Sequence, residues 1–491
     1  MTILALDQGT SSSRAILFDD KLRPLHSAAR PVTQSYPRPG EVEHNPRELI
    51  DGILSCAREV LALVPRGSVA AIGLTNQRET TLLWDRATGE ALHPAIVWQD
   101  RRTAAACEAV QKAGHEDLIR ARSGLLCDPY FSASKLSWLL DHLPGARLRA
   151  EAGELCFGTV DSWLIWHLTG GRLHVTDATN AARTALFNIH TQEWDADLCA
   201  LWRIPMGLLP QVRDSAGEFG VTDPGVLGQA LPIRGVAGDQ QAAAMGQGCF
   251  APGQIKSTYG TGCFVLLNTG AQAVQSRHRL LTTVAARLKG EVSYALEGAI
   301  FVAGAAVQWL RDGPGLIARP DELEALAALA DPADGTLLVP AFSGLGAPWW
   351  SPESRGALLG LSARSGRAEI ARAVLQSAGY QTRDLIGAMQ ADWQSDAGMV
   401  LRVDGGMANS DAVVQFIADI LGAPVDRPGV TEATACGAAW LAAWASDLAP
   451  GPQEFARSWA AERRFTPQLP PERREALYAR WQKAVAATLA F

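Results

Sequence analysis

The chain has 491 residues, of which 47% are hydrophobic, and this length is sufficient for two or more domains with buried cores. Its 44 Lys and Arg residues against 51 Asp and Glu residues give a net charge of −7, so neither nucleic acid nor an anionic membrane surface is indicated as a partner. The eight cysteines contain no CxxC pair, which favours reduced thiols over a disulfide framework or a zinc site. The longest uncharged apolar stretch near the middle, Gly298 to Leu310, is too short to span a bilayer, so we expect a cytoplasmic protein without membrane insertion.

The first predicted elements are two strands, Ile3 to Leu6 and Ala15 to Phe18, joined by a turn that begins at Gly9. One interpretation is a solvated hairpin with Asp7 as a capping residue. The other is a phosphate-binding turn, in which backbone N–H groups approach a phosphate, Arg14 adds positive charge and Asp7 faces a magnesium ion. The hydroxyl donors of such a turn would be Thr10, Ser11, Ser12 and Ser13.

Residues 70–75 and 80–84 read as two further strands around a turn, which predicts a hairpin and a partly antiparallel sheet. Arg78 and Glu79 lie in that turn, and they can act on one ligand only if the preceding strand has already ended. A donor beside an acceptor suits a small polyol, while the alternative is an exposed ion pair. Trp98 and Tyr130 could form an apolar wall beside them or belong to the core.

Asp239 follows an apolar run at a predicted junction between a strand and a helix. It could be an N-cap residue of that helix. If an alcohol attacks a phosphate in this protein, a carboxylate at such a position could instead accept the proton of the alcohol.

The second half of the chain begins after the breaker-rich segment 246–253 and repeats a feature of the first half. A Gly-Thr turn at Gly260 to Gly262 again leads into an apolar strand, which indicates two similar halves that each offer one turn to a shared site. Further on, Gly405 and Gly406 follow a strand and offer either a flat surface for an aromatic base or a tight turn. Leu477, Trp481, Val485 and Leu489 recur every four residues and predict an amphipathic C-terminal helix.

Several frequent motifs are absent from the sequence. There is no GxxxxGK[ST] loop, no GxGxxG after a strand, no GxSxG and no HExxH. If the protein binds a phosphate, it must therefore use another kind of phosphate-binding site.

Taken together, these segments resemble the FGGY family of carbohydrate kinases, within the sugar kinase, Hsp70 and actin superfamily. The resemblance runs nearly end to end, and the stretches TNQRET, VTDATNAARTALFNI and YGTGCF are typical of the members that act on glycerol. Other matching stretches are LALDQGTSSSRAILFD, AIVWQDRRT, GDQQAA, ALEGAIFVAGAAVQWLRD and VPAFSGLGAPWW.

The resemblance implies an α/β fold of two actin-like, ribonuclease H-like domains, with mixed sheets flanked by helices and the active site in the interdomain cleft. We expect domains at residues 1–248 and 249–491. The implied reaction is ATP-dependent phosphorylation of glycerol to sn-glycerol 3-phosphate by direct in-line transfer, with Mg²⁺ as cofactor. Members of the family form dimers or tetramers, so a homo-oligomer is expected.

The resemblance also assigns roles to individual residues. Asp239 would be the general base, and Asp7 and Asp239 would hold the metal. The substrate would be bound by Arg78, Glu79, Trp98, Tyr130, Asp239, Gln240 and Phe264. The nucleotide would be bound by Thr10, Ser11, Ser12, Arg14, Thr261, Gly304, Gln308, Gly406 and Ser410.

The sequence departs from the family pattern in three places. The asparagine that usually follows the double glycine by four residues stands one place early, at Asn409, and Ser410 occupies its position. Residues 221–233 lack the Gly-Gly-x-Arg loop that binds fructose 1,6-bisphosphate in enterobacterial members, and residues 218–220 lack the histidine that is phosphorylated in Gram-positive members. We therefore expect neither form of regulation.

Two alternatives remain from the sequence. One is an FGGY kinase for another small polyol or sugar, which would share the fold and the base. The other is a non-catalytic actin-like or chaperone-like protein, which would need neither the polyol anchors nor Asp239.

Overall fold

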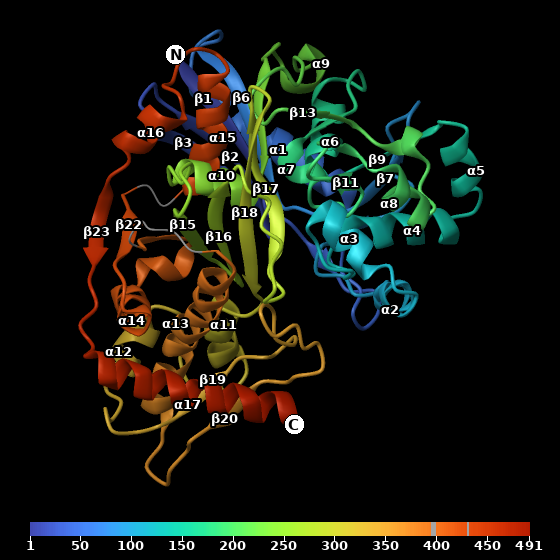
Figure 1. Cartoon of the computed structure of the whole chain (residues 1–491). Coiled ribbons are helices and arrows are strands. Elements are labelled where there is room, and N and C mark those ends of the chain that lie inside the picture. Colours follow the sequence, from blue (N-terminus) through green and yellow to red (C-terminus); the bar gives the residue numbers. More distant parts are fainter. Residues whose placement is uncertain (394–398, 430–431) are drawn as a thin grey trace.

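Two large sheets organise the chain in the computed structural model, which describes residues 1–393, 399–429 and 432–491. The first has the strand order β14-β6-β1-β2-β3, and the second has the order β17-β18-β16-β15-β21-β22-β23. Figure 1 shows the first sheet among the N-terminal elements at the top and the second sheet below it. The strands of the first sheet are β1 (Thr2–Gln8), β2 (Ser12–Phe18), β3 (Pro24–Pro31), β6 (Val69–Asn76) and β14 (Ile233–Gly238). Those of the second are β15 (Ile255–Tyr259), β16 (Cys263–Gly270), β17 (Leu281–Leu288), β18 (Glu291–Ile300), β21 (Leu401–Asp404), β22 (Val425–Pro428) and β23 (Ala461–Phe465).

The two sheets repeat one topology. In the first sheet β1 pairs antiparallel with β2 and β2 with β3, while β6 and β14 add on in parallel. In the second sheet β15, β16 and β18 form the antiparallel part, while β21 and β22 add on in parallel. The prediction of two similar halves with mixed sheets is confirmed.

The strand pairings confirm two of the predicted hairpins and correct the third. The turn at Gly9 joins β1 and β2, and the turn at Gly260 joins β15 and β16. The hairpin expected over residues 70–84 is wrong. β6 lies in parallel between β1 and β14, and β7 (Leu82–Asp85) pairs with β9 (Leu155–Gly158) in a separate sheet. β6 is buried from Ala71 to Asn76 because it is a central parallel strand, covered on both sides.

Helix α1 (Pro46–Leu61) covers one face of the first sheet. Its start follows the usual rules, since Asn45 accepts a hydrogen bond from the Arg47 N–H and Pro46 fills the first turn. On the other face lie α10 (Asp239–Gly246) and α15 (Ala433–Trp444), which pack against each other. The two helices touch so closely that a Cβ on Gly437 would lie 1.8 Å from the Ala242 oxygen. Helix α15, from the second half of the chain, thus closes the core beneath β1, β6 and β14 (Figure 1).

A lobe built from residues 82–213 projects from the first sheet, on the right of Figure 1. It has its own apolar core around Phe131, Leu136 and Phe157. Its elements are α2 (Ala104–Lys112), α3 (Glu116–Ser123), α4 (Ser132–His142), α5 (Ala146–Glu151), α6 (Val160–Leu168), α7 (Ala178–Ala181), α8 (Ala196–Leu201), β10 (Val175–Asp177), β11 (Phe187–Asn188), β12 (Glu193–Trp194), β13 (Gln211–Arg213) and the 3-10 helix η1 (Met206–Leu208). The lobe also contains β8 (Ala95–Ile96), which pairs with β5 (Glu43–His44). Strand β4 (Gln34–Ser35) and helix α9 (Pro224–Leu227) are further short elements outside the lobe.

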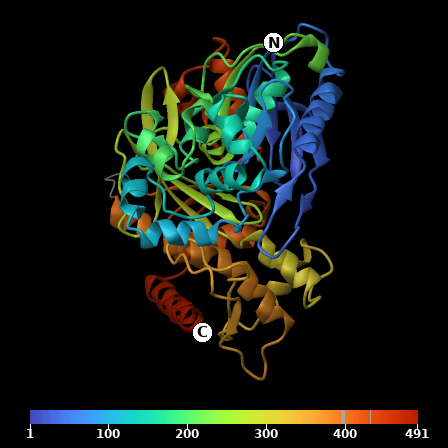
Figure 2. The same cartoon turned by 90° about the vertical axis from the view of Figure 1, so that its right-hand side faces the viewer.

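The remaining helices pack on and below the second sheet, at the bottom of Figure 2. They are α11 (Gly304–Asp312), α12 (Glu322–Ala327), α13 (Arg367–Asp392), α14 (Asp411–Leu421), α17 (Pro471–Ala490) and the 3-10 helix η2 (Gly406–Asn409), with the strand pair β19 (Leu337–Val339) and β20 (Ala357–Leu359). Helix α16 (Pro452–Ser458) lies instead near the N-terminal elements at the top of Figure 1, where Phe455 stacks against Trp440 of α15. The predicted C-terminal helix is confirmed as α17. Trp481 and Val485 are fully buried on its inner side, whereas Leu489, which the spacing placed in the same stripe, is exposed near the end of the chain.

All eight cysteines are free, as the sequence predicts, and all are buried. Within residues 1–393, 399–429 and 432–491, no helix combines the length and the apolar character that a membrane span requires.

Candidate active site

Arg78 and Glu79 follow the end of the central strand β6. The strand ends at Asn76, so the condition that lets both side chains serve one site is met. Arg78 is 3% exposed and Glu79 is 1% exposed, and Glu79 adopts a positive φ of 59°. The alternative of an exposed surface ion pair is therefore wrong.

The Arg78 guanidinium lies at the centre of a buried ion cluster. It donates to both carboxylate oxygens of Glu297 on β18, at 2.6 Å and 2.9 Å. Arg183, from the lobe, donates to Glu79 at 2.6 Å and to Glu297 at 3.0 Å. Burial alone would lower the pKa of Arg78, but the charges of Glu297 and Glu79 outweigh it and raise that pKa well above its usual value. The cluster thus keeps both arginines charged where water does not reach them.

The sequence interpretation missed Arg183 and Glu297 as site residues, although both stand in stretches that carry the family resemblance. Glu297 is a single acid within the buried, otherwise apolar part of β18, and Arg183 follows a run of small residues after α7. A charged residue in a buried strand needs a partner of opposite charge, and this was the available signal.

Asp239 is the first residue of α10 and faces the cluster. The N-cap position belongs to Gly238, so the interpretation of Asp239 as an N-cap residue is wrong. Its Oδ1 accepts from the Gln240 N–H at 2.7 Å and lies 3.3 Å from the Arg78 Nε. Its side chain is 28% exposed, which leaves a route to a ligand. Burial raises the pKa of Asp239, while the charges of Arg78 and Lys256 oppose this rise.

Three aromatic side chains from different parts of the chain form one wall beside this cluster. The Trp98 ring lies 5.7 Å from that of Tyr130 and 5.9 Å from that of Phe264, edge to face in both cases. The Arg78 guanidinium lies 5.9 Å from the Phe264 ring, and the Arg183 guanidinium 5.6 Å from the Tyr130 ring. Apolar surface and hydrogen-bonding groups therefore meet here, as in small-molecule sites.

The first turn lies next to this wall, because the Trp98 Nε1–H donates to the Thr10 hydroxyl at 2.9 Å. The Gly9 N–H donates to the Ser12 oxygen at 2.9 Å and closes the turn. Thr10 and Ser12 are half-buried and Ser11 is exposed, so their hydroxyls can be approached, whereas Ser13 is buried and bonded to the Gln8 side chain.

Arg14 holds two carboxylates at the end of this hairpin. It donates to Asp7 at 2.9 Å and to Glu432, directly before α15, at 2.6 Å. Asp7 is buried, and burial raises its pKa against the charge of Arg14. The solvated hairpin expected as one alternative does not describe this end of β1.

The second turn carries Thr261 and lies against the start of α11. The Thr261 oxygen accepts from the Ala303 N–H at 2.9 Å and from the Ala305 N–H at 3.0 Å. Gly304 begins α11, and Gln308, four residues later, is exposed on the same face of that helix.

The double glycine after β21 lies beside this second turn. Gly405 approaches the Tyr259 oxygen closely, and Gly406 begins η2 with open space around it. The strand thus turns directly into η2, as the interpretation of a tight turn expected, and the binding of an aromatic base at the exposed Gly406 stays a prediction.

Ser410 has a structural role in the helix that follows. It is the N-cap residue of α14, accepts from the Val413 N–H, and donates its hydroxyl hydrogen to Glu324 at 2.7 Å. Asn409, directly before it, is exposed. Both partners of the Ser410 hydroxyl are thus protein groups.

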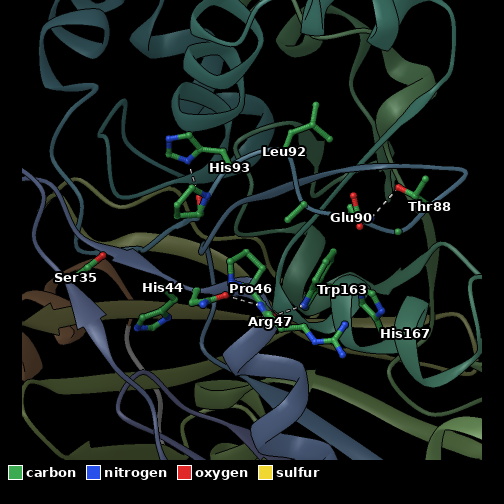
Figure 3. A pocket seen from close by; sticks show the side chains of 14 residues that line it. Ser35, His44, Pro46, Arg47, Thr88, Glu90, Leu92, His93, Trp163 and His167 are labelled. Carbon is green, nitrogen blue, oxygen red and sulfur yellow. Dashed lines mark hydrogen bonds between the residues drawn. The ribbon is translucent and has the colours of Figure 1, made fainter.

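A pocket of about 640 Å³ lies elsewhere, between the start of α1, the loop of residues 88–94 and α6 (Figure 3). His44, Arg47, His93, Trp163 and His167 are among the residues that line it. A second pocket, of about 320 Å³, lies between α13, α14 and α17. None of the residues assigned to substrate or nucleotide lines either pocket.

Comparison with known proteins agrees with this arrangement. The N-terminal domain of the FGGY family of carbohydrate kinases matches residues 2–246, and the C-terminal domain of that family matches residues 255–446. A protein named Glycerol kinase from Cereibacter sphaeroides is 60% identical over 99% of both chains, and one of the same name from Methylobacterium nodulans is 59% identical over 99% of this chain and 98% of its own. The crystal structure of Plasmodium falciparum glycerol kinase with ADP aligns with a TM-score of 0.92 at 33% identity, covering 99% of this chain and 98% of the other. The chain therefore belongs to the FGGY family of carbohydrate kinases.

Proposed function

We propose that this enzyme transfers the γ-phosphoryl group of ATP to glycerol and forms sn-glycerol 3-phosphate. The observation that carries the proposal is the grouping of Arg78, Glu79 and Asp239 against one aromatic wall. A polyol offers each hydroxyl as donor and acceptor and each carbon as apolar surface, so it fits an arginine beside a carboxylate and a wall of rings. The relatives named Glycerol kinase support the same choice.

Asp239 is the proposed general base. Its carboxylate would accept the proton of the attacking hydroxyl while the oxygen forms its bond to the γ-phosphorus in line with the leaving group. Because burial raises the pKa of Asp239, the carboxylate is a stronger base than an exposed aspartate, and Arg78 at 3.3 Å keeps it from being protonated too readily.

Substrate contacts are assigned around that base. Arg78 and Glu79 would hydrogen-bond the glycerol hydroxyls, with Tyr130 and Gln240 as further donors. Trp98 and Phe264 would cover the carbon chain. The ion pairs to Glu297 and Arg183 hold Arg78 and Glu79 in place before the substrate arrives, which lowers the entropic cost of binding.

Mg²⁺ fits the acidic groups on this side of the site. Burial raises the pKa of both Asp7 and Asp239, and the negative charge of Asp7 adds to the rise at Asp239. A divalent cation would favour the ionised form of both carboxylates. Within the described residues no group of three or more His, Cys, Asp or Glu side chains could hold a metal by itself. This suits Mg²⁺, which usually takes one or two carboxylates together with waters and substrate phosphates. When bound, the ion would offset the charge of the phosphates, and Asp7 and Asp239 would hold it.

The nucleotide would lie along the two turns. Thr10, Ser11, Ser12 and Arg14 are assigned to the phosphates from the first turn, and Thr261 from the second. The adenosine side would include Gly304, Gln308, Gly406 and Ser410. The division into domains 1–248 and 249–491, the cytoplasmic location and the assembly into a dimer or tetramer remain predictions.

A panel of polyols with ADP release as readout tests the substrate. Glycerol should be phosphorylated faster than xylulose, xylitol or erythritol, and faster turnover of any of these would favour an FGGY kinase for another substrate.

Asp239→Asn tests the chemistry. Phosphorylation should fall by several orders of magnitude while ADP still binds, because the amide cannot accept the proton. Asp197→Asn, a change of an exposed acid in the first turn of α8, is the control and should leave turnover unchanged. Unchanged activity in Asp239→Asn would remove this residue from the role of base, and loss of ADP binding would point to a structural role.

A further inference from the structure

Lys256 is a fully buried lysine at the second position of β15, the strand that leads into the second turn. Its ammonium donates to the Gln240 Oε1 at 2.6 Å and to the Thr258 hydroxyl at 2.7 Å. Gln240 directly follows the proposed base Asp239. The bond therefore links the second sheet to the residue beside the reacting centre.

The chemistry of the ammonium fixes the orientation of the Gln240 amide. An ammonium donates only, so the atom of Gln240 that it contacts must be the oxygen. The amide nitrogen Nε2 then points away from Lys256. In the described part of the chain Nε2 has no hydrogen-bond partner, yet it is not among the fully buried polar atoms that lack one. Nε2 therefore keeps some accessible surface, although Gln240 as a whole is only 6% exposed, and its N–H donors are free to meet a ligand.

The position of Lys256 is costly for a residue that only fills space. Among the described residues no carboxylate lies within ion-pair distance of its ammonium. The charged groups that act on it from further away are the carboxylates of Asp404, Asp239 and Glu297 and the guanidinium of Arg78. Burying a cation without a direct ion partner is unfavourable, and an apolar side chain would avoid that cost. Burial lowers the pKa of Lys256 while the charges of Asp404 and Asp239 oppose that fall, so a lysine at this place has a cost that points to a role in the site.

We propose that Lys256 is a positioning residue for the substrate: it holds the Gln240 oxygen so that the Gln240 amide donates to a hydroxyl of the bound polyol. This inference rests on the proposed function of the site. Without Lys256 the amide could turn by half a rotation and present its oxygen, which would offer the ligand an acceptor in place of two donors. Lys256 would thus act on substrate affinity through Gln240 and without touching the substrate.

A double-mutant cycle tests the proposal. Lys256→Met, Gln240→Leu and the double variant are compared with the wild type by steady-state kinetics and by calorimetric titration with the polyol that the wild type phosphorylates. Lys256→Met should raise the KM and the dissociation constant of the polyol about tenfold, the loss typical of one hydrogen bond to a charged or well-held group, and change the KM of ATP less than twofold. In the Gln240→Leu background the same substitution should have no further effect on polyol affinity, because the oriented amide is already gone.

Ser257→Ala is the matched control. Ser257 is the next residue of β15, is equally buried, points to the opposite face and contacts the Cys263 sulfur at 3.0 Å. It should leave polyol affinity unchanged.

Additive effects of Lys256→Met and Gln240→Leu, or an unchanged polyol affinity in Lys256→Met, would overturn the proposal. If Lys256→Met does not fold, Thr258→Val removes one of the two partners of the ammonium and should raise the polyol KM two- to threefold, again only when Gln240 is present. The absence of that rise would overturn the proposal as well. Failure of the wild type to phosphorylate glycerol would instead contradict the proposed substrate, and the cycle would then report on Lys256 with the polyol that is used.

Discussion

Arg78 and Glu297 form a two-pronged ion pair, with both carboxylate oxygens within 2.9 Å of the guanidinium, although 219 positions of sequence separate them. Arg78 belongs to the part of the chain that matches the N-terminal domain of the family, and Glu297 to the part that matches the C-terminal domain. The pair is fully buried and Arg183 shares it, so this ion cluster forms only when the two halves are folded against each other.

Glu297→Gln should therefore destabilise the protein strongly. The substitution removes the negative charge that Arg78 and Arg183 share at position 297. Removing one partner of a buried ion pair lowers the unfolding free energy by about 3–5 kcal/mol. Denaturant unfolding measures this loss. Glu291→Gln, at the exposed start of the same strand, is the matched control and should stay within about 0.5 kcal/mol of the wild type. Equal stability of the two variants would mean that the cluster contributes nothing to the fold.

Alanine substitutions at Gly405 and Gly406 should have different effects, the first on stability and the second on nucleotide binding. Gly405 has a φ of +87°, and a Cβ there would lie 2.5 Å from the Tyr259 oxygen, so Gly405→Ala should lower the unfolding free energy by at least about 1–2 kcal/mol. Gly406 has no heavy atom within 4 Å of such a Cβ, so Gly406→Ala should fold normally. If the adenine lies on this backbone, Gly406→Ala should weaken ADP binding in calorimetry while the melting temperature is unchanged. If Gly406→Ala binds ADP with the affinity of the wild type, the adenine does not lie on this backbone.

His174 should make stability depend on pH in a defined direction. Burial lowers the pKa of His174 from 6.5 to about 4, and the ring packs edge to face against Trp84 and Trp166. In the unfolded chain His174 is protonated below about pH 6.5, whereas in the folded chain it is protonated only below about pH 4. The contribution of His174 to the unfolding free energy is therefore fully present above pH 6.5 and is lost as the pH falls towards 4, by up to about 3 kcal/mol.

Comparison with His174→Gln at neutral pH and near pH 4.5 isolates this contribution. Asp161 and Asp384, whose pKa values burial raises to about 6, act in the opposite direction over the same range, but they are present in both proteins and cancel in the difference. The wild type should lose more stability on acidification than the variant does. An identical loss in both would show that His174 titrates normally.

Fructose 1,6-bisphosphate should not inhibit this enzyme. Residues 221–233 contain neither Arg nor Lys, so this segment offers no cation to a bisphosphate. Steady-state assays with millimolar concentrations of the sugar should give unchanged rates, with ADP as a positive control for inhibition. Strong inhibition would require a binding site elsewhere on the molecule.

Much of the fold could be predicted from the sequence, because the signals are local. The hairpins at Gly9 and Gly260 follow from glycine and hydroxyl residues between apolar runs, and the internal repeat follows from their similarity. The hairpin expected over residues 70–84 failed because a short apolar run looks alike whether its neighbour in the sheet is next in sequence or far away. The assignment of Leu489 to the buried stripe failed because the spacing of a helix does not tell where the protein body ends.

By itself, the sequence determined the chemical character of the site: a carboxylate after a strand, a donor beside an acceptor, and two turns rich in glycine and hydroxyls. Only the tertiary structure decided which charges complete it. Glu297 and Arg183 come from β18 and from the lobe, and each is paired with a residue more than 100 positions away in the sequence. Lys256 of β15 is bonded to Gln240, which is only 16 positions away but lies in the first turn of the helix that packs against the first sheet. A buried polar or charged group needs an ion pair or a hydrogen bond to offset its burial, and the packing of the two sheets and the lobe sets which residues supply it.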